Sequence, residues 1–400
     1  MANSPAAASV FPSRLPGRWL ALGQSDEPDA GGAGARAARR ALAHADAKLL
    51  VVFCSEAYDL DRLLAAVNEE SGQVPLVGCS TAGEIGTSGP GDAGVVVMAL
   101  GGADFTVRTA VAPGASGDLR GAGATVAACV DGVAHRPHRV LLLLSDGLAG
   151  DQQEVVRGAY GVVGAEVPLV GGCAGDGLKM RRTFQFHGST VLHDAVVGAA
   201  LGSEGSLGIG VSHGWRRVGA PMVVTGSSGT RVHSLDEEPA LDVYLERLEA
   251  PAEVRTDPGS FTRFALTHPL GISRRSGEEV RFIADADFDD RSIGCIAEVP
   301  QGGLAWIMEG DEDSVLQASD DACEAAVGDL DGRPPLGFLA FDCIARRGVL
   351  GDVGIRREIE RISAHAGGAP VAGFYTYGEI ARVGGAGGFH NQTLVVLALG

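Results

Sequence analysis

Apolar and polar positions follow two alternating patterns along the chain, and together they predict one structural unit. Residues 48–54 (KLLVVFC) are a continuous apolar run, typical of a strand that is buried on both faces. Residues 59–70 then place leucines at helical spacing, which predicts an amphipathic helix. A glycine-rich stretch at 74–85 and an apolar run at 94–100 complete the unit. This order predicts a strand, a helix, a loop and a strand of an α/β layer.

The same order recurs twice further along the chain. In the second copy, the strand, helix and closing strand are predicted at residues 138–146, 151–163 and 195–201. In the third copy, they are predicted at residues 336–343, 355–366 and 393–400. A weaker apolar stretch at 292–311 predicts two strands joined by a turn. The repetition indicates a duplicated α/β architecture.

The loop of each copy is written in nearly the same letters: VPLVGCSTAGEI (74–85), VPLVGGCAGD (167–176) and APVAGFYTYGEI (369–380). Its proline ends the preceding helical region, and its glycines allow a tight turn and close approach of other groups. One interpretation is that these glycines serve packing alone. The other is that the polar residues between them, at the ends of sheet strands, form a ligand site, as is common in α/β folds.

The remaining segments complete the predicted organisation of the chain. Residues 1–25 begin with an Ala-, Ser- and Pro-rich run and are expected to be disordered, residues 26–35 to form a loop, and 36–45 a helix. We expect two layered α/β domains with mixed sheets, both built from the repeated unit, at residues 26–232 and 233–400. The second domain would open with a helix in PALDVYLERL.

Composition narrows the class of protein. The formal net charge of −18 argues against nucleic acid or anionic membrane as a partner, because both favour basic surfaces. The seven cysteines are widely spaced without a CxxC pair, which is typical of reduced thiols in a cytoplasmic protein. No apolar run approaches the ~18 residues needed to span a membrane. Glycine is the outlier, with 60 of 400 residues, about twice the usual ~7%.

Several motifs together resemble one known family. PLVGCSTAGEI, SDGLAGD, PLVGGCAGD and GIGVSHGW are similar to the FIST N-terminal domain. PALDVYLERL, HPLGI, FDCIAR, PVAGFYTYGEI and FHNQTLVVLAL are similar to the FIST C-terminal domain. The resemblance covers residues 36–400 and implies an intracellular sensory module for signal transduction. It also implies a small ligand, with amino acids as a suggested class.

The resemblance carries further implications for cofactors and partners. Some family members that consist of these domains alone are associated with haem and nitric-oxide sensing. In other members the module is fused to kinase, cyclase or F-box parts. Nothing in this sequence resembles such parts, so a signal would have to pass to a separate partner, such as a histidine kinase or a cyclase.

The first loop offers a hydroxyl and a thiol beside glycines. Cys79, Ser80, Thr81 and Gly83 could hold a ligand through hydroxyl groups and exposed main-chain amides. The alternative is an acyl-transfer enzyme with Cys79, or the Ser80 or Thr81 beside it, as nucleophile, although the spacing is not G-x-S-x-G and no base is placed beside it. Helix capping and packing are the structural interpretation.

Charged residues of the loops form the second set of candidates. Glu84 and Glu379 occupy equivalent positions in copies one and three, and Asp176 is their expected counterpart in copy two. Three such carboxylates facing one cleft could receive the ammonium group of a ligand, or each could cap a helix. Arg346 could hold a ligand carboxylate through two hydrogen bonds, or form a surface ion pair.

The remaining candidates are polar or aromatic residues beside glycines. They are expected to line a pocket, or else to pack with satisfied hydroxyl and amide groups. They are Gly172, Cys173, Tyr375, Tyr377, His390 and Asn391. A bound haem would need an axial histidine, for which His187, His193 and His213 are the candidates, and the lack of CxxCH means that attachment would be non-covalent.

Overall fold

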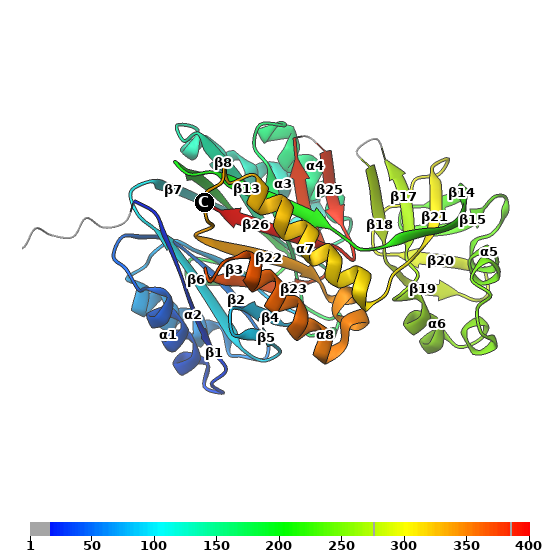
Figure 1. Cartoon of the computed structure of the whole chain (residues 1–400), viewed down its shortest axis with the longest axis horizontal. Coiled ribbons are helices and arrows are strands. Elements are labelled where there is room, and N and C mark those ends of the chain that lie inside the picture. Colours follow the sequence, from blue (N-terminus) through cyan, green and yellow to red (C-terminus); the bar gives the residue numbers. More distant parts are fainter. Residues whose placement is uncertain (1–16, 275–276, 385) are drawn as a thin grey trace, which may run out of the picture.

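The computed structural model describes residues 17–274, 277–384 and 386–400; the predictions made for residues 1–16 lie outside this range. Three mixed sheets form a body, and a fourth sheet forms a lobe on one side of it (Figure 1). The prediction of layered α/β structure with mixed sheets is therefore confirmed.

Each sheet of the body is built mainly from one of three successive stretches of chain. Stretch one contains β1 (Trp19–Ser25), α1 (Ala30–Ala41), β2 (Ala47–Cys54), α2 (Leu60–Ser71), β3 (Leu76–Ser80), β4 (Glu84–Gly86), β5 (Gly89–Gly91) and β6 (Val95–Gly101). Stretch two contains β7 (Phe105–Pro113), α3 (Leu119–Ala127), β8 (His138–Asp146), α4 (Gln152–Val163), β9 (Leu169–Ala174), β10 (Gln185–His187), β11 (Thr190–Leu192) and β12 (Ala195–Ser203). Stretch three contains β13 (Leu207–Ser212), α7 (Glu312–Gly328), β22 (Gly337–Cys343), α8 (Ile344–His365), β23 (Val371–Thr376), β24 (Glu379–Val383), β25 (Ala386–His390) and β26 (Leu394–Leu399).

The three stretches repeat one topology. Their strand orders are β1-β6-β2-β3, β7-β12-β8-β9 and β13-β26-β22-β23. In each, the last strand of the order pairs in parallel with its neighbour, and the other pairs are antiparallel. We call β3, β9 and β23 the motif strands, because each carries the repeated glycine-rich letters and is followed by a motif loop.

Beyond each motif loop, the chain leaves its own sheet. Hairpin β4-β5 of stretch one pairs with β23, hairpin β10-β11 of stretch two pairs with β3, and hairpin β24-β25 of stretch three pairs with β9. Each motif strand thus gains a neighbour from another stretch instead of remaining an open edge. The exchange is cyclic, so all three sheets are joined through main-chain hydrogen bonds.

The inward faces of the three sheets share one core. Alternate residues of the central strands meet there, among them Phe53, Leu142 and Phe341, all without exposed surface. The rings of Phe53 and Phe374 lie 4.7 Å apart, and those of Phe341 and Phe374 lie 5.8 Å apart. Because helices cover the outer faces, both faces of these strands are buried, which explains the continuous apolar runs.

Glycines place the outer helices close to their neighbours. A Cβ on Gly34 of α1 would lie 2.6 Å from the Leu63 carbonyl oxygen of α2, and one on Gly123 of α3 would lie 2.1 Å from the Val155 oxygen of α4. Helix α1 begins at Ala30 after the N-cap Asp29, so the loop predicted at 26–35 is wrong for most of its length. Helix α3 was not predicted, because its glycines disguise the helical pattern.

The lobe is inserted into stretch three between β13 and α7. It contains β14 (Arg216–Ser228), β15 (Arg231–Leu235), β16 (Glu238–Pro239), α5 (Ala240–Arg247), α6 (Pro258–Ala265), β17 (Leu270–Arg274), β18 (Gly277–Arg281), β19 (Ile283–Asp287), β20 (Ser292–Cys295) and β21 (Leu304–Glu309). It has its own apolar core, which includes Leu241, Phe261 and Ile293. In Figure 1 it projects to the right of the body.

Three expectations about segments need correction. Residues 19–25, placed in a disordered N-terminal segment, form β1, which pairs with β6 along its whole length. The boundary expected after residue 232 falls inside β15, so it does not separate two sheets. The two strands expected in 292–311 are β20 and β21, but they pair with different neighbours rather than with each other.

Two glycines of α4 provide a test of the packing role of glycine. A Cβ on Gly158 would lie 1.9 Å from the Arg120 carbonyl oxygen, whereas one on Gly161 would enter open space. We expect Gly158→Ala to lower the free energy of unfolding by about 2 kcal/mol through overpacking. The matched Gly161→Ala should raise it by roughly 0.5–1 kcal/mol, because alanine favours helix. Urea unfolding of both variants measures the difference, and equal effects would contradict this role.

Candidate functional site

The three motif loops lie side by side and are bonded to one another through their main chains. Each pair of loops shares at least one hydrogen bond, so the three close a ring of contacts. The bonds, donor first, include Ala82 N to Tyr375 O (3.0 Å), Gly175 N to Ser80 O (3.0 Å) and Tyr377 N to Cys173 O (3.1 Å). The repeated letters therefore build a cross-linked centre.

A threonine and a glutamate repeat the same contacts in two of the loops. Thr81 Oγ1 donates to Glu84 Oε1 at 2.6 Å, and Gly94 N donates to Glu84 Oε2 at 2.9 Å. In the same way, Thr376 Oγ1 donates to Glu379 Oε1, and Thr393 N donates to Glu379 Oε2 at 3.2 Å. Both carboxyl groups are buried, and each bridges its loop to the start of the closing strand.

The counterpart of these glutamates in copy two is Gln185, not Asp176 as expected. Gln185 lies opposite Cys79 in the β10–β3 pair, as Glu379 lies opposite Gly172 in the β24–β9 pair. Its Oε1 accepts a hydrogen bond from Ala195 N at 3.3 Å, next to the closing strand. More residues separate the motif loop from its hairpin in copy two than in the other two copies. A comparison of the three sequences therefore placed Asp176, and not Gln185, at the position of the glutamates.

Burial makes the two glutamates weaker acids than an ordinary glutamate. It raises the pKa of Glu84 to about 7 and that of Glu379 to about 8, although hydrogen bonds from the threonines and main-chain amides partly offset this. Glu379 has no exposed surface. A neutral carboxyl group resembles an amide in shape and charge, which agrees with the presence of Gln185 at the equivalent position of copy two.

Asp176 instead organises the second loop. Its oxygens accept hydrogen bonds from Met180 N at 2.9 Å and Arg181 N at 2.7 Å, and the Tyr377 hydroxyl also donates to it. Burial alone would raise the pKa of Asp176, but the hydrogen bonds from Tyr377 and the main-chain amides outweigh it and lower the pKa. Asp176 is thus an ionised loop anchor.

The other predicted residues of loops one and two are packed in the interior. Cys79 is fully buried, and burial raises the pKa of its thiol well above the usual value. Ser80 Oγ donates to Gly175 O at 2.7 Å and accepts from Phe184 N at 2.9 Å. The remaining three are also held by close contacts: Gly83 against Tyr375, Gly172 against Thr376, and Cys173 with its sulfur 3.3 Å from Ser145 Oγ.

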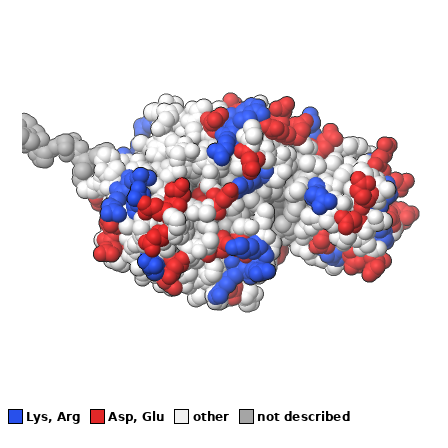
Figure 2. All heavy atoms as spheres, turned by 90° about the horizontal axis from the view of Figure 1, so that it is seen from below, with Lys and Arg blue, Asp and Glu red and all other residues white. Residues whose placement is uncertain are grey.

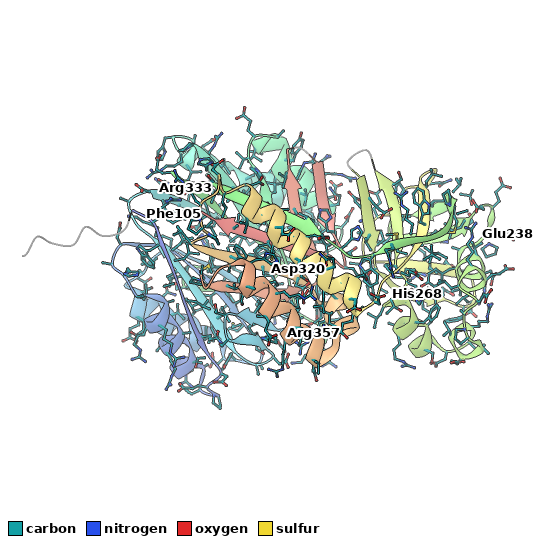
Figure 3. All side chains as sticks on the ribbon, viewed as in Figure 1. Phe105, Glu238, His268, Asp320, Arg333 and Arg357 are labelled. Carbon is teal, nitrogen blue, oxygen red and sulfur yellow. The ribbon has the colours of Figure 1, made fainter. Side chains whose placement is uncertain are left out.

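Arg346 is buried, not exposed as a carboxylate receptor or surface ion pair. Its Nε donates to Asp342 Oδ1 at 2.7 Å, and its Nη2 donates to Glu358 Oε1 at 2.5 Å and to Ser319 Oγ at 2.9 Å. All these side chains lack exposed surface. Burial, then the nearby Glu358 charge, raises the pKa of Asp342, and Arg346 only partly offsets this. The cluster joins α7 and α8 to β22; Asp320 of α7 and Arg357 of α8 are labelled in Figure 3.

A cleft of about 830 Å³ lies between the body and the lobe. Figure 2 shows the outline of the molecule narrowing where the two meet. In Figure 3, His268 lies on the body side of the lobe and Glu238 at its far end. The body contributes loop and helix residues, including Ala82, Leu178, Met180, Ile344 and Arg347, and the lobe contributes Thr262, Leu266, Phe282, Ala284 and Ile296.

Two of the predicted site residues line this cleft. Tyr377 reaches it while bonded to Asp176, and Asn391 lines it with only 1% of its surface exposed. Within the described part of the chain, Asn391 Oδ1 has no hydrogen-bond partner. Tyr375 does not line the cleft; its ring lies in the interior, with the Arg347 guanidinium 5.2 Å from the ring centre.

The sequence analysis missed Arg347, which directly follows the predicted site residue Arg346. Successive residues on a helix point about 100° apart, so Arg346 enters the interior while Arg347 faces the cleft. Arg347 pairs with Asp92, whose side chain is 70% exposed. The doubled arginine in FDCIARR was the available signal. The lobe residues of the cleft gave none, since they are mostly apolar residues from separate segments of the lobe.

A smaller pocket of about 480 Å³ adjoins the body near Glu84. It is lined by charged residues, among them Asp26, Glu27 and Arg36, and by residues 88–96. Asp92 lines both this pocket and the cleft, so the segment around it separates the two.

The candidate haem ligands do not fit the cleft. His187 Nε2 lies 3.0 Å from Thr109 Oγ1, His193 is exposed in the turn before β12, and His213 Nδ1 accepts from Trp215 N at 3.0 Å. None of the three, nor His390, whose Nε2 lies 3.0 Å from Ala381 O, lines the cleft. Among the residues described, no group of three or more His, Cys, Asp or Glu side chains is placed to hold a metal ion.

The raised pKa of Glu379 predicts a specific pH dependence. A carboxyl group whose pKa rises from 4.5 to about 8 on folding stabilises the fold at low pH, and this contribution is lost as pH rises toward 8. We expect Glu379→Gln, which copies Gln185, to be more stable than the wild type by about 1–3 kcal/mol near pH 9 and nearly equal to it near pH 5.

The control for this test is Asp176→Asn. The lowered pKa of Asp176 means that its carboxylate stabilises the fold above its ordinary pKa, so this variant should be less stable at both pH values. Urea unfolding at the two pH values measures both variants. Parallel curves for Glu379→Gln and the wild type would contradict a protonated Glu379.

Comparison with known proteins places the chain in a family. Residues 48–238 match the FIST N domain, and residues 240–382 match the FIST C domain. An uncharacterized protein of Mycobacterium tuberculosis is 29% identical over 229 residues, which is 56% of this chain and 59% of that protein. One of Mycobacterium bovis is 30% identical over 244 residues, 56% of this chain and 58% of that protein.

A more distant relative is an uncharacterized protein of Methanocaldococcus jannaschii, 25% identical over 175 residues, or 41% of this chain and 34% of that protein. The chain thus spans about three fifths of the mycobacterial relatives and a third of the archaeal one. No helix in the described part of the chain is both long and apolar enough to cross a membrane. The chain belongs to the FIST family of sensory domains for signal transduction.

Proposed function

We propose that this protein is a non-enzymatic sensory module whose small ligand, an amino acid or similar metabolite, binds in the cleft between body and lobe. The observation that carries the proposal is the cleft itself, whose 830 Å³ is in the range of small-molecule sites and whose walls are mainly apolar with a few polar groups. This moves the expected site from the motif loops to the space beside them.

The position of the cleft suits a sensor because a ligand there contacts both the body and the lobe, whose strands form separate sheets. The chain passes between body and lobe at residues 213–215 and again at 310–311. At the first passage, Trp215 Nε1 donates to Gln392 O at 3.0 Å. A ligand that binds one relative position of body and lobe more tightly would shift the population toward it. The partner that receives this signal would be a separate cytoplasmic protein, with a histidine kinase or a cyclase as the classes suggested by the family.

The two alternatives receive less support. An acyl-transfer enzyme was expected to use Cys79 or the Ser80 or Thr81 hydroxyl beside it, but the thiol is buried in the core and both hydroxyls are hydrogen-bonded within the interior. A haem sensor would need an axial ligand. No histidine of the described residues lines the cleft, and burial holds the pKa of the Cys343 thiol, which does line it, well above its usual value. The contacts of these residues therefore support neither acyl transfer nor haem binding over the binding of a small metabolite.

A thermal-shift screen with amino acids and related metabolites tests the proposal. A ligand at a hundredfold excess over Kd stabilises the folded state by about 2.7 kcal/mol, which raises Tm. Filling the cleft with Ala284→Trp should abolish the shift. The matched control Val223→Trp, at a lobe position outside the cleft, should retain it. A ligand response that survives Ala284→Trp would show that the site lies elsewhere.

A further inference from the structure

Among the described residues that line the cleft, carboxylates outnumber cations. Arg347 is the cation among the residues that line it, and it already pairs with the carboxylate of Asp92. A second carboxylate, that of the exposed Asp352, also lines the cleft and acts electrostatically on Arg347. Taken together, the described residues of the lining therefore carry one positive and two negative formal charges.

A buried amide points to the same kind of ligand. Asn391 lines the cleft with 1% of its surface exposed, and none of the described residues places a donor within hydrogen-bond distance of its Oδ1. A buried acceptor without a donor is unfavourable, so a ligand that brings an N–H group gains more here than one that brings another acceptor. The amide and the surplus carboxylate thus favour the same chemistry.

Much of the remaining lining of the cleft is apolar. Leu178 and Met180 are 61% and 54% exposed, which is unusual for such large apolar side chains, and both line the cleft. Leu266, Phe282 and Ile296 face the same space from the lobe. A flexible methionine beside aliphatic and aromatic residues accommodates apolar groups of varied shape.

We propose that the ligand of the cleft is an amphipathic amine, with a primary ammonium group on an apolar body and no carboxylate requirement. The inference rests on the proposed function and narrows it, because an amino acid presents a carboxylate to a site that already has a carboxylate in excess. The ammonium group lies toward Asp352 and Asn391, and the apolar body packs between Met180 and the lobe.

Three compounds with one indole body separate the possibilities. They are tryptamine, which is an amine; indole-3-propionate, which is a carboxylate; and tryptophan, which is a zwitterion. Isothermal titration calorimetry of the full chain should give a Kd for tryptamine at least tenfold below that for indole-3-propionate and no higher than that for tryptophan. Ala284→Trp should remove tryptamine binding, and Val223→Trp should retain it.

Substitutions of the charged residues should change the affinity for tryptamine in opposite directions. Arg347→Gln removes the positive charge and should tighten tryptamine binding about threefold to tenfold, whereas a carboxylate receptor would lose affinity for its ligand. Asp352→Asn should weaken tryptamine binding about threefold. Asn391→Leu should weaken it about tenfold while leaving the Tm of the free protein unchanged or higher, because an unpaired buried acceptor is removed.

The outcomes distinguish this inference from the proposed function. If indole-3-propionate or tryptophan binds more tightly than tryptamine, or if Arg347→Gln weakens tryptamine binding, the amine assignment is overturned while the cleft remains the site. If no compound of the trio binds, the amine assignment is likewise overturned. If the wider metabolite screen also gives no shift that depends on Ala284, the proposed function fails as well.

Discussion

The exchange of hairpins between the three sheets is the constraint on which the rest of the body depends. Each motif strand would be an open edge without a hairpin beside it. If its own hairpin folded back onto it, the three sheets would be held together by side-chain packing alone. Instead, the chain crosses to a neighbouring sheet after every motif loop, so the main-chain pairing runs through all three sheets. The loops therefore cross one another in a small space. This explains glycine at a crossing point such as Gly175, where a Cβ would lie 2.7 Å from the main-chain nitrogen of Ala82 in another loop.

The same crossing explains the polar residues that resemble a ligand site. The two threonines accept hydrogen bonds from main-chain amides inside their own loops, and the two glutamates accept them from amides just before the closing strands. The donors are Gly83 and Gly378 for the threonines, and Gly94 and Thr393 for the glutamates. In the buried interior such groups are expensive to leave unpaired, so a polar side chain at each crossing has a structural reason. Sequence letters between glycines cannot distinguish this role from ligand binding, because both need hydrogen-bonding groups beside a flexible main chain.

The sequence predicted some elements of the fold accurately and missed others. Strand β8 and helices α2 and α4 were predicted within a residue or two, because apolar runs and helical spacing are local signals. Helices α1 and α3 were missed or misplaced, because close contact between helices replaces the usual leucines with glycine and alanine. The insertion of the lobe and the partners of each hairpin are long-range facts with no local signal. Of the predicted site residues, only Tyr377 and Asn391 line the cleft, since its walls come from segments far apart in the chain.

A rigid centre next to a cleft has a consequence for how a signal would leave the protein. The motif loops share main-chain hydrogen bonds, and Arg346 is held by two carboxylates in the interior, so neither can rearrange without losing several buried contacts. The lobe has its own core, but its Val280, Ala297 and Met308 also pack into an apolar cluster of the body beside the two short passages of chain. In the described part of the chain, no strand pairing joins the lobe sheet to the body sheets, so motion between body and lobe would break side-chain contacts and not strand pairs. Under the proposed function, a ligand that touches both walls would act on the relative position of body and lobe.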